Sequence, residues 1–445
     1  MRGCKPYSPV IASKGMRLGQ DLNSWEYKPL WSVVTCNDDA LEKGLSADDE
    51  IRYVDISAVT HDQGISRAEV MSIANAPSRA QRRAKSGDVV VSTVRTYLKA
   101  IAEVSDNFAD CVFSTGFAVL RSRSNVLHSR YLKWLVLNDL LVQAIEAHST
   151  GVSYPAINAS ELLKLKIPLP PYDQQVKICE MLDHETGRID ALIKKKTSFI
   201  ELLKEKRQAL ITQAVTKGLD PNVPMCDSGV EWIGIVPEGW RVGRVRWYSQ
   251  IQSGIAIGSK PVLSHSIELP YLRVANVQDG HLDLREMKAV SIPRNQVARY
   301  SLMEGDVLMN EGGDNDKLGR GAVWRCEFEP CLHQNHVFAV RPTKGLMSEW
   351  LALYTQSQPA KAHFRVSAKQ STNLASISST NIKELILPIP SLDEQVSILE
   401  KLGQQSGLLD KLVKRTQDSI ELLKERRSAL ITAAVTGQID LRGGA

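Results

Sequence analysis

Clusters of basic and polar side chains are the groups of this sequence whose chemistry best suits a charged ligand. Four basic residues stand just before a strand-like run at Val89–Val94: Arg79, Arg82, Arg83 and Lys85. Lysine and arginine neutralise phosphate groups, so this cluster predicts contacts to the backbone of a nucleic acid. The alternative for any single residue of this kind is an ordinary solvated loop, and the sequence alone leaves that alternative open.

Loops behind two corresponding strands carry side chains that can reach the edges of bases. Arginine, asparagine and glutamine form hydrogen bonds with base edges in the major groove of DNA. The predicted base-reading residues are Arg95, Tyr97 and Lys99 after the first strand, and Asn310, Asn315, Lys317 and Arg320 after the second. Two polar loops further along the chain are predicted to face the same ligand, with the candidate residues Gly151, Tyr154, Gln370 and Asn373.

Motifs of known catalytic and metal sites are missing from the sequence, so no catalytic residue and no metal site are predicted. The stretch GIAIGSKP (254–261) is nearest to a phosphate-binding loop, but its glycines are too close together. LPPY (169–172) lacks the Asn or Asp with which amino-methyltransferases hold the target amine. The cysteines and histidines between 326 and 336 do not have the spacing of a common zinc finger.

Length and composition place the chain among ordinary globular proteins. It has 445 residues, 55 Lys and Arg against 50 Asp and Glu, and a net charge of +5 that is too small to reveal a partner. No apolar run approaches the roughly 18 residues of a membrane helix, and the N-terminus lacks the apolar core of a secretory signal. The seven scattered cysteines favour a reducing compartment, so we expect a cytoplasmic protein.

An internal repeat organises the chain. Residues 167–220 align with 387–440 at a constant offset of 220, with 27 identities in 54 positions. Shorter similarities precede it, such as GDVVVSTV (87–94) with GDVLMNEG (305–312), and FAVLR (117–121) with FAVRP (338–342). The repeat predicts four parts: a first variable domain at 1–155, a helical segment at 156–225, a second variable domain at 226–375 and a helical segment at 376–445.

Each repeated segment predicts a proline-punctuated strand followed by a long helix. Residues 188–215 and 408–435 contain neither Pro nor Gly, and 28 residues at about 1.5 Å each give a rod of roughly 42 Å. Asp173 and Asp393 are the expected N-caps, Gly187 and Gly407 the expected breaks near the start, and Gly218 and Gly437 the expected ends. The stripe predicted to pair the helices is Ile189, Ile193, Ile200, Leu203, Leu210, Leu409, Val413, Ile420, Leu423 and Leu430.

Two such stripes on one chain can bury each other. We therefore predict an antiparallel coiled coil and a pseudo-two-fold symmetric chain, whereas the alternative is that each helix packs only on its own globular neighbour. Strand-like and helix-like runs alternate in the variable regions. The predicted fold is thus α/β (α+β), with two mixed α/β domains joined by two long helices.

The repeated segments resemble the DNA specificity (S) subunit of Type I restriction–modification systems. The resemblance rests on IPLPPYDQQVKI, IELLKEKRQALITQAVTKGLDPNVPMCDSGVEWIGIVPEGW and their second copy ILPIPSLDEQ and IELLKERRSALITAAVTGQIDLRG, and on the order of the four parts. One departure is that the second variable domain opens with VEWIGIVPEGW, where the first has QDLNSWEYKPL (20–30).

The resemblance implies a non-catalytic subunit with two target-recognition domains, each reading one half of a bipartite, asymmetric DNA sequence. It also implies that the paired helices set the spacer and dock two methyltransferase subunits, and that restriction subunits join for cleavage. S-adenosylmethionine, ATP and Mg²⁺ would be bound by those partners and not by this chain. Two alternatives remain at this point: a coiled-coil adaptor with two ligand-binding domains and no DNA role, and a chain that itself methylates DNA.

Overall fold

The structure is a computed structural model that describes residues 25–439, apart from Lys43, 257–265, 314–317, Lys344 and 371–374. The chain divides into two compact units. The first unit contains residues 1–196 and 418–445, and the second contains residues 197–417. Both boundaries fall inside long helices, because each end of a long helix packs with the sheets nearest to it. The division therefore differs from the four consecutive parts that the repeat predicts.

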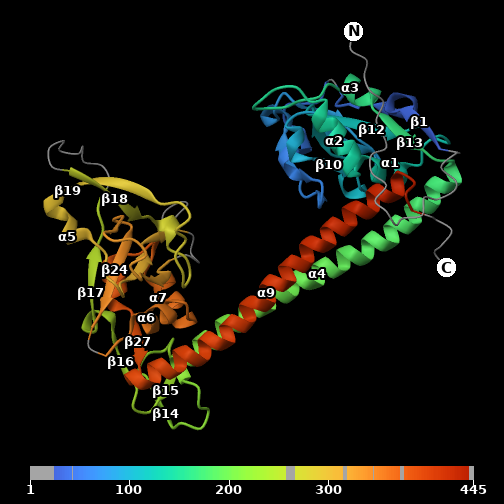
Figure 1. The fold of residues 1–445 in the computed structure, drawn as a ribbon. Coiled ribbons are helices and arrows are strands. Elements are labelled where there is room, and N and C mark those ends of the chain that lie inside the picture. Colours follow the sequence, from blue (N-terminus) through green and yellow to red (C-terminus); the bar gives the residue numbers. More distant parts are fainter. Residues whose placement is uncertain are drawn as a thin grey trace. The chain divides into compact units, whose positions relative to one another are not determined.

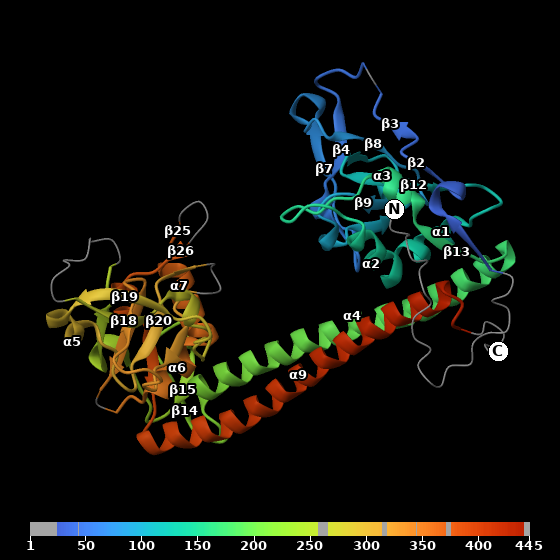
Figure 2. The ribbon, with the colours of Figure 1, turned by 45° about the horizontal axis from the view of Figure 1, so that its top comes forward.

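Two sheets form the centre of the first unit (Figure 2). The first has the order β10–β9–β12–β2, with strands at Ile101–Glu103, Val89–Ser92, Phe117–Ser122 and Val34–Cys36. The second has the order β3–β8–β11–β4–β7, with strands at Asp39–Ala40, Ala80–Arg83, Val112–Ser114, Glu50–Val54 and Glu69–Ser72. A short hairpin, β5 (Val59–Thr60) and β6 (Gly64–Ile65), adds to them.

Strand β9 shows how the sequence builds two layers of core. Val89 and Val91 pack against the helices of the unit, whereas Val90 packs against the second sheet with Phe113. Alternate residues of a strand point to opposite faces, so an uninterrupted valine run is buried on both sides. The helices are α1 (Ser129–Val136), α2 (Asp139–Ala147) and α3 (Ala159–Lys164).

The second unit repeats this plan. Its first sheet has the order β17–β24–β20–β22, with strands at Ser249–Ser253, Val337–Pro342, Val307–Asn310 and Gly321–Val323. A three-stranded sheet follows the order β19–β18–β23, with strands at Lys288–Pro293, Ser266–Leu272 and Leu332–His333. A small third sheet has the order β21–β26–β25, at Gly312–Gly313, Ala375–Ser376 and Lys369–Gln370. The helices are α5 (Val297–Tyr300), α6 (Ser348–Thr355), α7 (Gln358–Ser367) and α8 (Ser379–Glu384), and a hairpin joins β14 (Met225–Asp227) to β15 (Ile235–Pro237). We call the sheets and short helices of each unit its globular region.

Sheet register corrects one detail of the repeat. Phe117 pairs with Ser92 on β9, and the residue in the same place on the other sheet is Val337, which pairs with Asn310 on β20. The strands therefore align Phe117 with Val337 and Arg121 with Arg341, one residue away from the match of FAVLR with FAVRP.

The proline-punctuated strands are peripheral, as their sequence predicts. Strand β13 (Lys166–Leu169) pairs only with β1 (Glu26–Pro29), and β27 (Ile386–Ile389) pairs only with β16 (Arg241–Arg244), within the described residues. Proline has no N–H to donate, so these strands cannot occupy the middle of a sheet.

Each proline-punctuated strand leads into a long helix, α4 (Tyr172–Lys217) or α9 (Leu392–Val435). Both helices run uninterrupted through Gly187 and Gly407, so the predicted breaks are wrong. On either side of Gly187, Leu182 and Ile189 are buried, and this packing offsets the roughly 1 kcal/mol that a helical glycine costs. No helix among the described residues has both the length and the apolar character required to cross a membrane.

The ends of the long helices match the prediction at one terminus and not at the other. Gly218 and Gly437 follow the helices with φ of +72° and +75°, the left-handed conformation that ends a helix. Asp173 and Asp393 are not N-caps, because they lie inside the first turn. There their charge still complements the positive end of the helix.

Figure 1 shows both long helices, and both contribute residues to the core of each unit. In the first unit, the start of α4 (Ile178, Leu182) shares a cluster with the end of α9 (Ile431, Val435). In the second unit, the end of α4 shares a cluster with the start of α9. The two helices are therefore antiparallel within each unit. All ten residues of the predicted pairing stripe are buried or half-buried.

Candidate nucleic-acid interface

Two loops of the first unit that were predicted as binding elements lie together. The 93–99 loop follows β9, and the 149–157 loop follows α2. Ile157 N–H donates to the Thr93 carbonyl at 2.8 Å, and the Thr96 hydroxyl donates to Ser149 Oγ at 2.9 Å. A β-bridge between Val94 and Ala156 completes the junction. The candidates Arg95, Tyr97, Lys99, Gly151 and Tyr154 thus belong to one surface, which we call the first loop pair.

Side chains of the first loop pair are exposed and include both cations and aromatic rings. Tyr97 is 52% exposed and Tyr154 is 67% exposed. The Arg95 guanidinium lies 5.2 Å from the centroid of the Tyr154 ring, a cation–π contact. Arg95 and Lys99 are exposed, and the described residues provide neither with an acidic partner. Such a surface can bind phosphates and stack on bases.

Backbone strain in the 93–99 loop presents these side chains. Arg95 and Lys99 both adopt the left-handed region, with φ of 51° and 49°, on either side of a short helical turn at Thr96–Leu98. Residues other than glycine rarely adopt this conformation, which costs about 1–3 kcal/mol at functional positions. The buried Thr96 holds the turn, since its backbone N–H and hydroxyl both bond to the neighbouring loop.

The second unit joins the corresponding segments in the same way. Ile377 N–H donates to the Glu311 carbonyl at 2.8 Å, which repeats the bond between Ile157 and Thr93. Strand β21 then pairs with β26, and β26 pairs with β25, which ends at the exposed Gln370. We call this surface the second loop pair. The predicted residues Asn315, Lys317 and Asn373 lie outside the described residues.

Asn310 was predicted to read bases, and the structure contradicts this prediction. Its side chain is only 2% exposed, and its amide donates to the carbonyls of Val277 at 3.0 Å and Val274 at 3.3 Å. Asn310 therefore fastens the 274–277 turn to β20. Arg320 is half-buried, with Nη1 3.3 Å from Gln278 Oε1, so part of its side chain lies inside the unit.

The basic residues around β8 do not form one free patch. Arg79 donates to Tyr53 Oη at 3.1 Å and to Asp55 at 2.8 Å. Arg82 and Arg83 are half-buried on the strand, and the exposed Lys85 lies 3.9 Å from Asp39. The Lys85 side chain is the most accessible of the four, and the phosphate contacts of this cluster stay a prediction.

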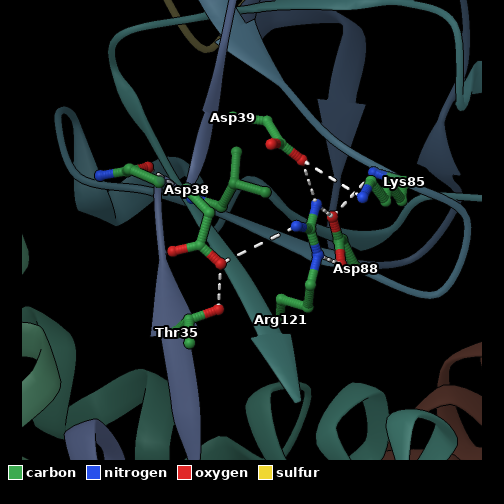
Figure 3. Close-up of polar contacts among 8 residues, drawn as sticks. Thr35, Asp38, Asp39, Lys85, Asp88 and Arg121 are labelled. Carbon is green, nitrogen blue, oxygen red and sulfur yellow. Dashed lines mark hydrogen bonds and ion pairs between the residues drawn. The ribbon is translucent and has the colours of Figure 1, made fainter. Parts of the chain in front are cut away.

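An ion-pair network that the sequence did not predict joins the turn before β9 to β12 and β3 (Figure 3). Arg121 donates to both oxygens of Asp88, at 2.9 and 2.7 Å, and to Asp39 at 2.8 Å. Its hydrogen bonds to Asp88 are the main cause that raises the pKa of the Arg121 guanidinium, and its hydrogen bond to Asp39 lowers the pKa of that carboxyl. Asp88 also accepts from Lys85 N–H at 2.7 Å, which fixes the turn before the strand.

The second unit contains the corresponding ion pair between an arginine and a buried aspartate. Arg341 donates to both oxygens of Asp306, at 2.7 and 2.8 Å, and Asp306 accepts from Met303 N–H at 2.8 Å. Asp306 is fully buried. The repeated Gly-Asp before each strand was the available sequence signal, since a carboxylate directly before a buried apolar run requires a partner. These pairs orient the strands from which the loop pairs emerge.

Cysteine and histidine side chains of the 326–336 segment are structural where they are buried. Cys331 and His333 lie in the interior, and His333 Nδ1 is 2.7 Å from the Val337 carbonyl. Burial lowers the pKa of His333. Among the described residues, no group of three or more His, Cys, Asp or Glu side chains is arranged to hold a metal ion.

Comparison with known proteins decides the family. A family model described as the Type I restriction modification DNA specificity domain matches residues 40–202 and 237–422. The chain belongs to this family. Its members are specificity subunits of type I restriction–modification systems, which are non-catalytic because catalysis lies on partner subunits.

Individual relatives agree with the family. The chain is 22% identical over 335 residues to the EcoKI specificity subunit of Escherichia coli strain K12, across 74% of this chain and 69% of that one. It is 28% identical over 210 residues to the StySPI specificity subunit of Salmonella potsdam, across 46% of this chain and 44% of that one. A chain from a structure concerned with complex assembly and conformational transition of the type I R-M system matches with a TM-score of 0.70 and 22% identity, over 96% of this chain and 100% of that one. This last likeness supports the fold.

Proposed function

We propose that this specificity subunit recognises a bipartite, asymmetric DNA target, with one half-site for each unit. One observation carries the proposal: each unit has its own loop pair. The two units build these surfaces from corresponding segments, which are joined by the same hydrogen bond between backbone groups. The loop sequences differ between the units, so the two half-sites are expected to differ. Phosphate contacts would supply most of the affinity and side-chain contacts to bases would supply the specificity.

The long helices support a coiled coil with pseudo-two-fold symmetry. Asp190 and Arg427 form an ion pair at 2.9 Å in the first unit. Asp410 and Arg207 lie 3.7 Å apart in the second unit. Each residue of one pair is displaced by 220 from an identical residue of the other, so both pairs have the same antiparallel register. Continued through the middle of the helices, this register would make a coiled coil that sets the spacer between the half-sites.

Exposed leucines on the helices support the docking of two copies of one partner. Leu192 and its repeat equivalent Leu412, and Leu202 and its equivalent Leu422, are between 43% and 64% exposed. Contiguous exposed apolar patches mark surfaces that proteins bind, and these leucines recur at equivalent positions of the two helices. We infer that two methyltransferase subunits occupy the two equivalent surfaces, that restriction subunits join them for cleavage, and that S-adenosylmethionine, ATP and Mg²⁺ are bound by those partners.

Competition binding tests the proposal. The purified chain, with its methyltransferase subunit, is titrated with a duplex that contains the target and with duplexes in which one half-site at a time is scrambled. Each scrambled half-site is expected to weaken binding, and binding to any duplex is expected to fall with salt. If one half-site alone accounts for all the sequence preference, the bipartite proposal fails. A coiled-coil adaptor with no DNA role would bind none of the duplexes in preference.

A further inference from the structure

Two threonines of the long helices bind helix N-termini of the globular regions. In the second unit, Gln358 N–H at the start of α7 donates to Thr212 Oγ1 at 3.1 Å. In the first unit, Asp139 N–H at the start of α2 donates to Thr432 Oγ1 at 3.2 Å. The first N–H groups of a helix have no acceptor within that helix, so a hydroxyl from another element can satisfy them. Thr212 and Thr432 are repeat equivalents, 220 residues apart.

The ordinary N-caps of these short helices are present as well. Ser357 accepts from Ala360 N–H at 3.4 Å, and Asn138 accepts from Leu141 N–H at 3.0 Å. The short helices are therefore capped without the threonines. The additional hydrogen bond to each threonine fixes the position of the short helix on the long helix.

One turn earlier on each long helix, the contact with the globular region has changed between the repeats. Ser428 donates to the Asp139 carboxylate in the first unit. In the second unit, Gln208 donates to the Gln356 carbonyl at 2.5 Å and accepts from Lys361 at 2.9 Å. The threonine bond is thus the part of this junction that both units share.

A second fixed point lies at the start of the other long helix. The buried Gln175 and Gln395 make the same three hydrogen bonds, at 2.8–3.1 Å. Each glutamine accepts from the backbone N–H of a helix N-cap residue, that of α1 or of α6, and donates to two carbonyls. These partners are His128, Val126 and Pro170 for Gln175, and Met347, Gly345 and Pro390 for Gln395. Each globular region is therefore hydrogen-bonded to both long helices, to one through the threonine and to the other through the glutamine. Bonds at two separated points restrict the rotation of the globular region relative to the helices.

We propose that Thr212 and Thr432 are positioning residues that set the angle of each globular region on the long helices, and through it the spacer length that the subunit accepts. This inference rests on the proposed function. Neither threonine belongs to a loop pair, so the sequence preference within each half-site is assigned to other residues.

The test replaces each hydroxyl by a methyl group in the full chain, as Thr212→Val and Thr432→Val. Duplexes with the target spacer, and with one base pair added or removed, compete for the complex of this chain with its methyltransferase subunit. Each variant is expected to reduce the discrimination between spacers by about three- to ten-fold, the effect of one hydrogen bond. The preference for each half-site sequence is expected to stay as in the parent protein, and Thr212→Ser is expected to restore the discrimination.

Matched controls come from the next turn of the same helices. Thr216 and Thr436 are also repeat equivalents, but their hydroxyls donate to carbonyls of their own helix, at 2.7 and 2.6 Å. Thr216→Val and Thr436→Val are expected to leave spacer discrimination unchanged. Equal discrimination in Thr212→Val and the parent, or an equal loss in Thr216→Val, would overturn the inference. A parent protein that shows no sequence preference would instead overturn the proposed function.

Discussion

Removal of the Arg95 side chain is the sharpest test of the first loop pair. Arg95 is exposed, and its only described side-chain contact is the one with the Tyr154 ring at 5.2 Å. An exposed cation–π contact contributes about 0.5–1 kcal/mol, so Arg95→Ala is expected to change the free energy of unfolding by no more than about 1 kcal/mol. Binding of the target duplex is expected to lose about 1–3 kcal/mol if Arg95 contacts a base, which is roughly 5- to 150-fold.

The assay distinguishes a base contact from a phosphate contact. Affinities are measured at several salt concentrations, for the target and for duplexes with single substitutions in each half-site. A base contact relaxes the preference at one position of one half-site, whereas a phosphate contact weakens all duplexes about equally and reduces the salt slope by about 1. Arg188→Ala is the control, since Arg188 is an exposed arginine of the same unit that lies on α4 and pairs with Glu185 at 3.0 Å. Unchanged affinity and unchanged preference in Arg95→Ala would remove this residue from the interface.

Three further predictions concern the framework of the two units. Arg341→Met leaves the buried Asp306 without its partner and is expected to lower the free energy of unfolding by about 3–5 kcal/mol in denaturant titrations, and a smaller loss than about 1 kcal/mol would contradict the assigned role. Gly218→Ala forces a side chain into a left-handed position, where its Cβ would meet the Trp240 ring at 3.4 Å, and is expected to cost about 1–2 kcal/mol by the same measurement, whereas an unchanged midpoint would refute it. Asp39 has a folded-state pKa below its unfolded value, because Arg121 hydrogen-bonds to it, so its contribution to stability is present above about pH 4 and is lost as the pH falls through the folded pKa. Asp39→Asn should flatten this acid limb of a pH titration of stability, and an identical limb would count against the assignment.

The long helices and their C-terminal ends were largely predictable from the sequence, because local features decide them. A stripe without Pro predicts a helix, and a glycine after the stripe predicts its end. Gly187 failed as a breaker because Leu182 and Ile189, five residues before it and two residues after it, are buried, which the glycine alone does not reveal. Asp173 failed as an N-cap because Pro171 already stands outside the helix and the first turn begins at Tyr172.

The convergence of the loops was predictable, whereas the role of each side chain was not. The strand before the 93–99 loop and the segment after α2 recur in both halves of the sequence, which indicated a shared surface. Asn310 has the same chemistry as a base-reading residue, but its partners Val274 and Val277 are more than 30 positions away in the chain. Only the folded structure shows that the side-chain amide of Asn310 donates hydrogen bonds to these two carbonyls. Arg121 and Arg341 were missed for the same reason, since their partners Asp88 and Asp306 lie in the turn before a neighbouring strand, more than 30 positions away in the chain.

The measurement that tests the central claim most directly is a map of the bases methylated by the complex of this subunit with its methyltransferase. We expect two short specified segments of different sequence, separated by an unspecified spacer of constant length. Exchange of the first loop pair, residues 93–99 together with 149–157, is expected to alter only one of the two segments. A single continuous or palindromic target, or a change in both segments after that exchange, would contradict the assignment of one half-site to each unit.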